Sequence, residues 1–432
     1  MLLLIFSSLI VLMVTGLPVA FCFMLINFVG VFLLWGGEAG LRQLTLSIFS
    51  SVASFILLPV PLFILMGEVM FRSGIANNMM DTLDKWLGAL PGRLGLLAVS
   101  GGTLFATLSG SSMASTAMLG SLLTPEMEGR GYKKPMSLGP ILGSGGLAIM
   151  IPPSALAVLL GAIGEISVGK ILIAIVVPGL VMAILYATYI IGRCYLQPSV
   201  APAYELTRVS ILGKLVATVR YILPLGAIIF LVIGVIFLGV ATPTEAAALG
   251  TIGAFILAAA YRSLNWKVVR ESVIDTVEIT VVIFMIIAGA RAFSQILAFS
   301  GASRGLVEFT VGLPLAPVFI VVAMQVVLLF LGMFMSVVAM MLITLPIFVP
   351  IVCGLGFDEV WFAVIFLLNI EMAMTSPPFG MSLFVMKSAA PPDTTLEDCY
   401  RAALPFLFCD LIVMALIIAF PAIVLWLPGL MW

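Results

Sequence analysis

The sequence predicts an all-α integral membrane protein built as an inverted structural repeat, with two re-entrant hairpins and two discontinuous helices. The first observation behind this prediction is composition. Of the 432 residues, 63% are hydrophobic and 9% are charged, whereas soluble proteins carry about 45–50% apolar and about 25% charged residues. The second is a series of apolar stretches long enough to cross a bilayer, some interrupted by small polar residues or double prolines. The third is a set of landmarks that recur at one constant offset.

The same composition excludes several kinds of functional site. The chain contains no histidine, which excludes zinc or haem held by histidine and a Ser-His-Asp triad. Its 19 basic and 20 acidic residues are scattered, so the sequence shows no basic patch of the kind that binds nucleic acids. The five cysteines show no CxxC spacing, and we interpret them as small apolar residues. We expect no transition-metal site.

Membrane helices need about 20 apolar residues. Uninterrupted apolar runs predict spans at 2–15, 18–35, 54–71, 170–192, 221–240, 243–262, 277–299 and 405–427. Four longer stretches are interrupted, two by small polar residues and two by proline pairs: 93–128 and 313–350, then 135–165 and 360–388. Between them we expect polar connectors at 193–220 and 262–276 and short amphipathic helices near 75–88 and 303–312. None of these runs alternates every second residue, as barrel strands do.

Lysine and arginine predict the orientation of the chain. The linker 193–220 carries several basic residues, and so does the connector 262–276. Two predicted spans separate these segments, so both lie on the same side of the membrane. The excess of positive charge makes that side the cytoplasmic one.

Landmarks in the two halves lie 225 residues apart. The matching pairs are Pro18 with Pro243, Ser111 with Ser336, Pro125 with Pro350, Gly131 with Gly356, and Pro152-Pro153 with Pro377-Pro378. An odd number of crossings in each half, with the basic linker between them, makes the second copy inverted. Inverted repeats with broken helices are typical of secondary transporters.

The interruptions are where we expect the chemistry. A small polar tip, 109–115, divides the first hairpin, and its counterpart at 332–336 divides the second. Double prolines break the two following helices, because proline lacks a backbone donor and disfavours helix at the preceding residue. The freed carbonyls must then line a protein-buried or hydrated cavity.

Carbonyl and hydroxyl oxygens together suit a small cation, and half-helix N-termini suit an anion. We therefore predict two cation sites, each formed where a hairpin tip faces a broken helix. The first comprises Ser111, Ser112, Gly145 and Ser154, and the second comprises Gly332, Ser336, Thr375 and Ser376. The alternative is that these small residues only allow close helix packing.

Charged residues inside apolar stretches are functional candidates. A structural role is the first expectation for Arg291, and contact with substrate or a pair with Glu371 is the alternative. Ser112, Arg291 and Thr375 are the candidate substrate contacts. Glu245 follows a Thr-Pro-Thr run, so we expect it to cap a helix. Asp410 has no partner predicted from the sequence.

Several motifs together resemble one family. They are Pro61–Gly67 with Ser73-Gly-Ile75, Leu90-Pro-Gly92, Ser109–Ser112, Gly131-Tyr132, Ile151–Ser154 and Ala241–Ala246. In order and spacing they resemble the large membrane subunit of tripartite ATP-independent periplasmic (TRAP) transporters, the DctM-like family, over essentially the whole chain. The second hairpin tip departs from a generic ion loop, since Met333-Phe-Met335 is apolar.

The resemblance implies an elevator-type transporter in the bacterial inner membrane, multi-pass and not an enzyme. It implies sodium-coupled import of an organic anion, a carboxylate or similar, with Na⁺ as the coupling ion and no other cofactor. It also implies two separate partners, a small four-helix membrane subunit and a periplasmic substrate-binding protein. The identity of the substrate does not follow from this chain.

The implied elevator divides the chain into a scaffold and a carrier. Scaffold segments with an arm helix are expected at 1–92 and 221–312, and carrier segments with a hairpin and a broken helix at 93–198 and 313–432. The cytoplasmic linker is 199–220.

Other functions fit the sequence less well. The nearest is a stand-alone sodium-coupled anion symporter or antiporter of related inverted-repeat fold. A channel fits inverted hairpin pairs less well than alternating access does. An intramembrane aspartyl protease needs two facing aspartates, and only Asp410 lies inside a predicted span.

Overall fold

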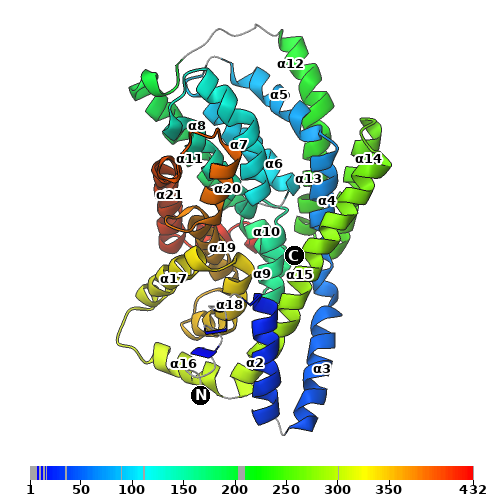
Figure 1. The fold of residues 1–432 in the computed structure, drawn as a ribbon, viewed down its shortest axis with the longest axis vertical. Coiled ribbons are helices and arrows are strands. Elements are labelled where there is room, and N and C mark those ends of the chain that lie inside the picture. Colours follow the sequence, from blue (N-terminus) through cyan, green and yellow to red (C-terminus); the bar gives the residue numbers. More distant parts are fainter. Residues whose placement is uncertain are drawn as a thin grey trace.

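The computed structural model describes residues 7–8, 11–12, 15, 17–34, 37–88, 90–109, 112–202, 210–299 and 301–431. Within these residues the chain is helical and contains no strand, so the all-α prediction is confirmed (Figure 1). The predicted span 2–15 and the residue Ser111 fall largely or wholly outside the described part. Nothing further is concluded about them.

The first half forms α2 (Val19–Leu34), α3 (Glu38–Val52), α4 (Pro59–Arg72), α5 (Ile75–Leu87), α6 (Arg93–Ser109), α7 (Ser112–Gly129), α8 (Lys134–Met150), α9 (Ala155–Gly164), α10 (Val168–Ala174) and α11 (Val176–Leu196). A connecting segment forms α12 (Ile211–Ala217) and α13 (Leu223–Phe237), joined by a π-helical turn. The second half forms α14 (Pro243–Ala260), α15 (Trp266–Phe299), α16 (Ala302–Val311), α17 (Pro317–Phe334), α18 (Val337–Gly354), α19 (Glu359–Thr375), α20 (Met381–Ala389), α21 (Leu396–Ala419) and α22 (Ala422–Leu425).

The helix bounds repeat at the offset that the landmarks predicted. Helices α7 and α8 correspond to α18 and α19 with both ends shifted by 225 residues. The amphipathic helices α5 and α16 lie at opposite ends of the molecule (Figure 1). One difference is clear: α15 is a continuous helix of 34 residues, whereas its counterpart is divided into α3 and α4 by the short 3₁₀ turn η1 (Phe55–Leu57).

Eight helical segments among the described residues are long and apolar enough to cross a membrane. The predicted connector 262–276 is wrong, because α15 already begins at Trp266. Its acidic residues Glu271 and Asp275 both pair with Arg72 of α4, which also contacts Glu68. These ion pairs allow a charged segment to continue as helix. The segment 193–220 is also more helical than predicted, since α11 ends at Leu196 and α12 begins at Ile211.

Two helices form the centre of the molecule. Helix α8 is buried from Met136 to Met150, and α19 is buried from Val360 to Thr375. A helix that is buried on all sides must be apolar or small on all sides, and glycines supply the small residues of α8. Helices α6, α7, α11 and α21 pack around this pair. The helices predicted to form the carrier therefore contain the best-buried part of the fold.

Ion pairs join the two halves of this central region at one end. The ammonium group of Lys134, at the start of α8, contacts Glu128 at 3.0 Å and Asp393 at 2.8 Å. The hydrogen bond from Lys134 lowers the pKa of the exposed Asp393 carboxyl. Because Lys134 and Asp393 belong to different halves, this contact links the two predicted carrier segments.

Candidate functional site

The first candidate cation site forms where α7 begins against α8. A Cβ atom on Gly145 would lie 3.3 Å from the carbonyl oxygen of Ser112, 3.4 Å from its Oγ, and would overlap Oγ1 of Thr116. Glycine is therefore what lets α8 approach the first turn of α7 so closely. The structure thus brings Ser112 and Gly145 together. Ser111 lies outside the described residues.

The hydroxyl groups at this contact lack partners among the described residues, as do those of Thr124, Ser272, Thr280 and Ser382. Ser112 and Thr116 are buried, and neither hydroxyl oxygen has a hydrogen-bond partner among the described residues. Buried polar atoms are nearly always paired, so unpaired ones call for an explanation such as an ion. Thr116 was not predicted as a site residue. Helical spacing could have identified it, because it lies four residues after Ser112 and therefore on the same face of α7.

Ser154 lies at the other end of the first helix break. It is buried, and its Oγ accepts a hydrogen bond from the backbone N–H of Ala157 at 3.3 Å. That bond caps α9, as serine does at helix starts. Ser336 plays the same part in the second half, where it caps α18 by accepting from Ala339 N–H at 3.3 Å. The structure therefore gives both predicted site residues a capping role.

The second candidate site has a less complete set of contacts. A Cβ on Gly332 would lie 2.6 Å from the Cβ of Ala373, so α17 packs closely against α19. At the end of α19, Thr375 donates to the carbonyl of Glu371 at 3.1 Å, and Ser376 donates to that of Met372 at 2.6 Å. Because each hydroxyl hydrogen is engaged, the oxygen lone pairs of both side chains stay available as acceptors.

The predicted pairing of Arg291 with Glu371 is wrong. Nη2 of Arg291 contacts Oε1 of Glu165 at 3.0 Å, and Glu371 is fully buried with neither oxygen partnered among the described residues.

The predicted capping role of Glu245 is confirmed, since Thr242 and Glu245 form a capping box at the start of α14. Asp410, for which no partner was predicted, accepts a hydrogen bond from the hydroxyl of Tyr186.

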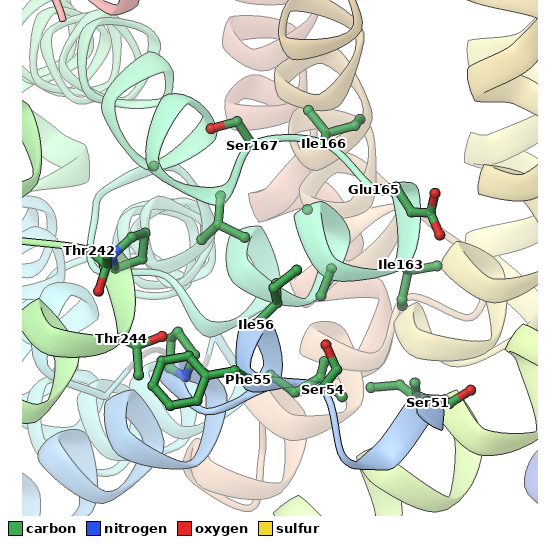
Figure 2. A pocket seen from close by; sticks show the side chains of 18 of the residues that line it. Ser51, Ser54, Phe55, Ile56, Ile163, Glu165, Ile166, Ser167, Thr242 and Thr244 are labelled. Atoms are coloured by element: carbon green, nitrogen blue, oxygen red, sulfur yellow. The ribbon is translucent and has the colours of Figure 1, made fainter. Parts of the chain in front are cut away.

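A cavity of about 920 Å³ lies between segments predicted as scaffold and segments predicted as carrier. Figure 2 shows Glu165 and Ser167 of the α9–α10 connection on one wall, with Ser54 and Thr244 on the opposite wall. Arg291 also lines the cavity, so the Arg291–Glu165 ion pair joins the two walls. None of the described cation-site residues lines it. A cavity of this size holds a small organic molecule.

Comparison with known proteins shows the family. Residues 6–423 match the family described as "Tripartite ATP-independent periplasmic transporter, DctM component". The chain is 33% identical to the C4-dicarboxylate TRAP transporter large permease protein DctM of Pseudomonas aeruginosa, covering 90% of each chain. It is 30% identical to the ectoine TRAP transporter large permease protein TeaC of Halomonas elongata, covering 98% of each. It is 28% identical to the sialic acid TRAP transporter large permease protein SiaM of Vibrio cholerae, covering 97% of this chain and 96% of the other.

The fold is shared with a solved transporter of low sequence identity. The crystal structure of the YdaH transporter of Alcanivorax borkumensis superposes with a TM-score of 0.68 at 14% identity, over 90% of each chain. That likeness concerns the fold alone. The match over nearly the whole sequence and the apolar spans lead to one conclusion: this chain belongs to the DctM family of TRAP transporter large permease subunits, multi-pass proteins of the bacterial inner membrane.

Proposed function

We propose that this chain is the translocating subunit of a sodium-coupled importer of an organic anion and that its carrier moves as an elevator. The observation that carries the proposal is the contact of Ser112 and Thr116 with Gly145, where buried hydroxyl oxygens without partners meet a helix of small residues. Sodium is a hard cation that prefers such oxygen ligands.

The relatives and the cavity support an organic anion as the substrate. Similar permeases are named for C4-dicarboxylate, ectoine, sialic acid and isethionate. In this chain the cavity is lined, among the described residues, by one cationic side chain, Arg291, together with several hydroxyl groups and the carboxylates of Glu359 and of Glu165, which pairs with Arg291 and would have to release it to an anion. An arginine guanidinium binds carboxylates and similar anions in a fixed, two-pronged geometry. We therefore propose that Arg291 binds the incoming anion. Ser112 and Thr375 would contact the substrate inside the carrier, beside the ion sites.

Two partners complete the proposed importer. The chain covers only 59% of the length of a longer relative, the isethionate TRAP transporter permease protein DctMQ of Oleidesulfovibrio alaskensis. That relative therefore contains further sequence beside the part that this chain matches. Many apolar side chains of α2, α13 and α15 are exposed, and lipid or a small membrane subunit would cover them. A periplasmic binding protein would deliver the substrate, as the word tripartite in the family description indicates.

Reconstitution tests this function. The chain is placed in proteoliposomes with its small membrane subunit. Its periplasmic binding protein is added after loading with labelled C4-dicarboxylate, sialic acid or isethionate in turn. One of these should accumulate with an inward sodium gradient and without ATP. Equal uptake after choline replaces sodium on both sides would refute sodium coupling. Full uptake by the isolated chain would instead favour a stand-alone symporter.

A further inference from the structure

Glu371 is a buried carboxyl group without a compensating partner. It lies in the interior helix α19, its exposed fraction is 0%, and neither of its oxygens has a hydrogen-bond partner among the described residues. An ionised carboxylate left unpaired inside a protein costs several kcal/mol, and such a group takes up a proton rather than keep its charge. The surroundings of Glu371 therefore suit a neutral carboxylic acid.

A second buried carboxyl group lies near Glu371. Asp410 of α21 is 2% exposed and interacts electrostatically with Glu371. The hydroxyl of Tyr186 on α11 donates a hydrogen bond to Asp410 and also interacts with Glu371. This bond stabilises a negative charge on Asp410, whereas nothing comparable stabilises one on Glu371. Two buried carboxyl groups close together do not both ionise, so the pair retains a proton.

No basic side chain in the described part of the chain neutralises this pair. Of the titratable groups on the helices packed against α19, Asp410 is the one that acts on the carboxyl group of Glu371. Helices α9, α17 and α22 contain no titratable side chain. The basic side chains of the other helices form ion pairs of their own, are exposed or lie in a last helical turn: Lys134, Arg401, Lys170 and Lys387.

The repeat places this acid against its own counterpart. The offset of 225 residues pairs Glu371 with Gly146, and a Cβ atom on Gly146 would overlap Oε1 of Glu371. The carboxyl group thus fills the space left by the missing side chain of its counterpart, so the two halves form one such site and not two. The first candidate cation site faces Gly145 instead. Consecutive helical residues point about 100° apart, so the two sites lie on different faces of α8.

The available oxygen atoms suit a proton better than a metal ion. Hard metal cations take about six or more oxygen ligands. This group offers two carboxyl groups and one phenol, whose hydrogen is already donated to Asp410. Within the described residues, no group of three or more acidic, cysteine or histidine side chains could hold a metal ion. A proton needs only one oxygen atom.

We propose that Glu371, Asp410 and Tyr186 form a proton-binding site in the interior of the predicted carrier, with the proton on Glu371. This site goes beyond the proposed sodium coupling, since its ligand, its residues and its face of α8 are all different. With the proton bound, Glu371 is neutral and α19 packs against α8 without an uncompensated charge. Loss of the proton to water would leave two carboxylates side by side, which disfavours this packing.

Infrared spectroscopy of the full-length chain in lipid nanodiscs tests the proposal without a substrate. At neutral pH exposed carboxyl groups are ionised, so a C=O band of a neutral carboxylic acid reports a buried one. We expect the wild type to show this band and Glu371→Gln to lose it. The band should also shift when H₂O is replaced by D₂O, because a binding site exchanges its proton with water. The matched control is Glu308→Gln, which removes an exposed carboxylate paired with Arg304 and should leave the band unchanged.

Three results would overturn the proposal: no such band in the wild type, a band that persists in Glu371→Gln, or a band that does not shift in D₂O. Should Glu371→Gln not fold, the wild type is labelled with ¹³C in its glutamate carboxyl groups and, separately, in its aspartate carboxyl groups. A shift of the band with the glutamate label supports the proposal. A shift with the aspartate label alone assigns the proton to Asp410 and contradicts it.

Discussion

At the scale of single residues, the sequence identified several members of the candidate site but not their contacts. The offset of 225 residues pointed to Ser112 and Gly145, which the structure brings together. Thr116 was missed because its significance depends on a contact between separate helices, whereas Glu371 was recognised as a charged residue inside an apolar stretch but was given the wrong partner. A serine beside a helix break suits both a helix cap and an ion site, so the sequence alone does not distinguish these two roles for Ser154 and Ser336.

The close approach at Gly145 leads to a first prediction. Gly145→Ala places a methyl group where Oγ1 of Thr116 lies, so it should disrupt the cation site and lower sodium affinity at least about tenfold. The measurement is ²²Na⁺ binding to the purified variant. The control is Gly192→Ala on α11, where an added Cβ meets nothing within 4 Å. Equal loss of binding in both variants would show that the effect is not specific to the site.

At the scale of helices, apolar runs predicted most elements, and charged segments caused the errors. The bounds of α5 and α16 agree with the predicted amphipathic pieces at 75–88 and 303–312. Helix α3 was missed because its polar sequence has no strong apolar run. The first turns of α15 were predicted as a connector because they carry charges. Their carboxylates pair with Arg72, a residue about 200 positions away, so the neighbouring sequence does not reveal that these charges are neutralised.

This ion-pair cluster gives a second prediction, for stability. Arg72→Ala would leave Glu68, Glu271 and Asp275 facing one another without a cation. We expect the free energy of unfolding to fall by about 1–3 kcal/mol, in the range for hydrogen bonds to charged groups. Thermal unfolding in detergent provides the measurement. Arg42→Ala removes an exposed pair with Glu38 and should change little, by about 0.5 kcal/mol or less.

At the scale of the whole molecule, the repeat was the most informative feature of the sequence. The recurring bounds of α7, α8, α18 and α19 follow the offset that single prolines and glycines revealed. The cavity was not predicted, because its walls come from segments far apart in the chain, around 51–59, 161–169 and 241–244. Local patterns contain no information about such a meeting of distant segments.

The ion pair across the cavity gives a third prediction, for motion. If the carrier slides against the scaffold, Arg291 and Glu165 must separate during each cycle. Cysteines in place of Ser54 and Ser167, which line the two walls and leave Arg291 intact, should on a cysteine-free background be joined by a bifunctional thiol reagent in one state, and this link should stop transport. Cleavage of the reagent's disulfide linkage should restore transport. Unimpaired uptake after complete crosslinking would show that these walls do not move apart.

The proposed transport mechanism depends on sodium binding where the first hairpin meets the first broken helix. Its most direct test is the sodium dependence of uptake by Thr116→Val, which keeps the shape of the side chain and removes the unpaired oxygen. Uptake is measured over a range of sodium concentrations at constant ionic strength, in the complete reconstituted system. We expect the variant to need a half-saturating sodium concentration at least about tenfold higher than that of the wild type. An unchanged sodium dependence would contradict it.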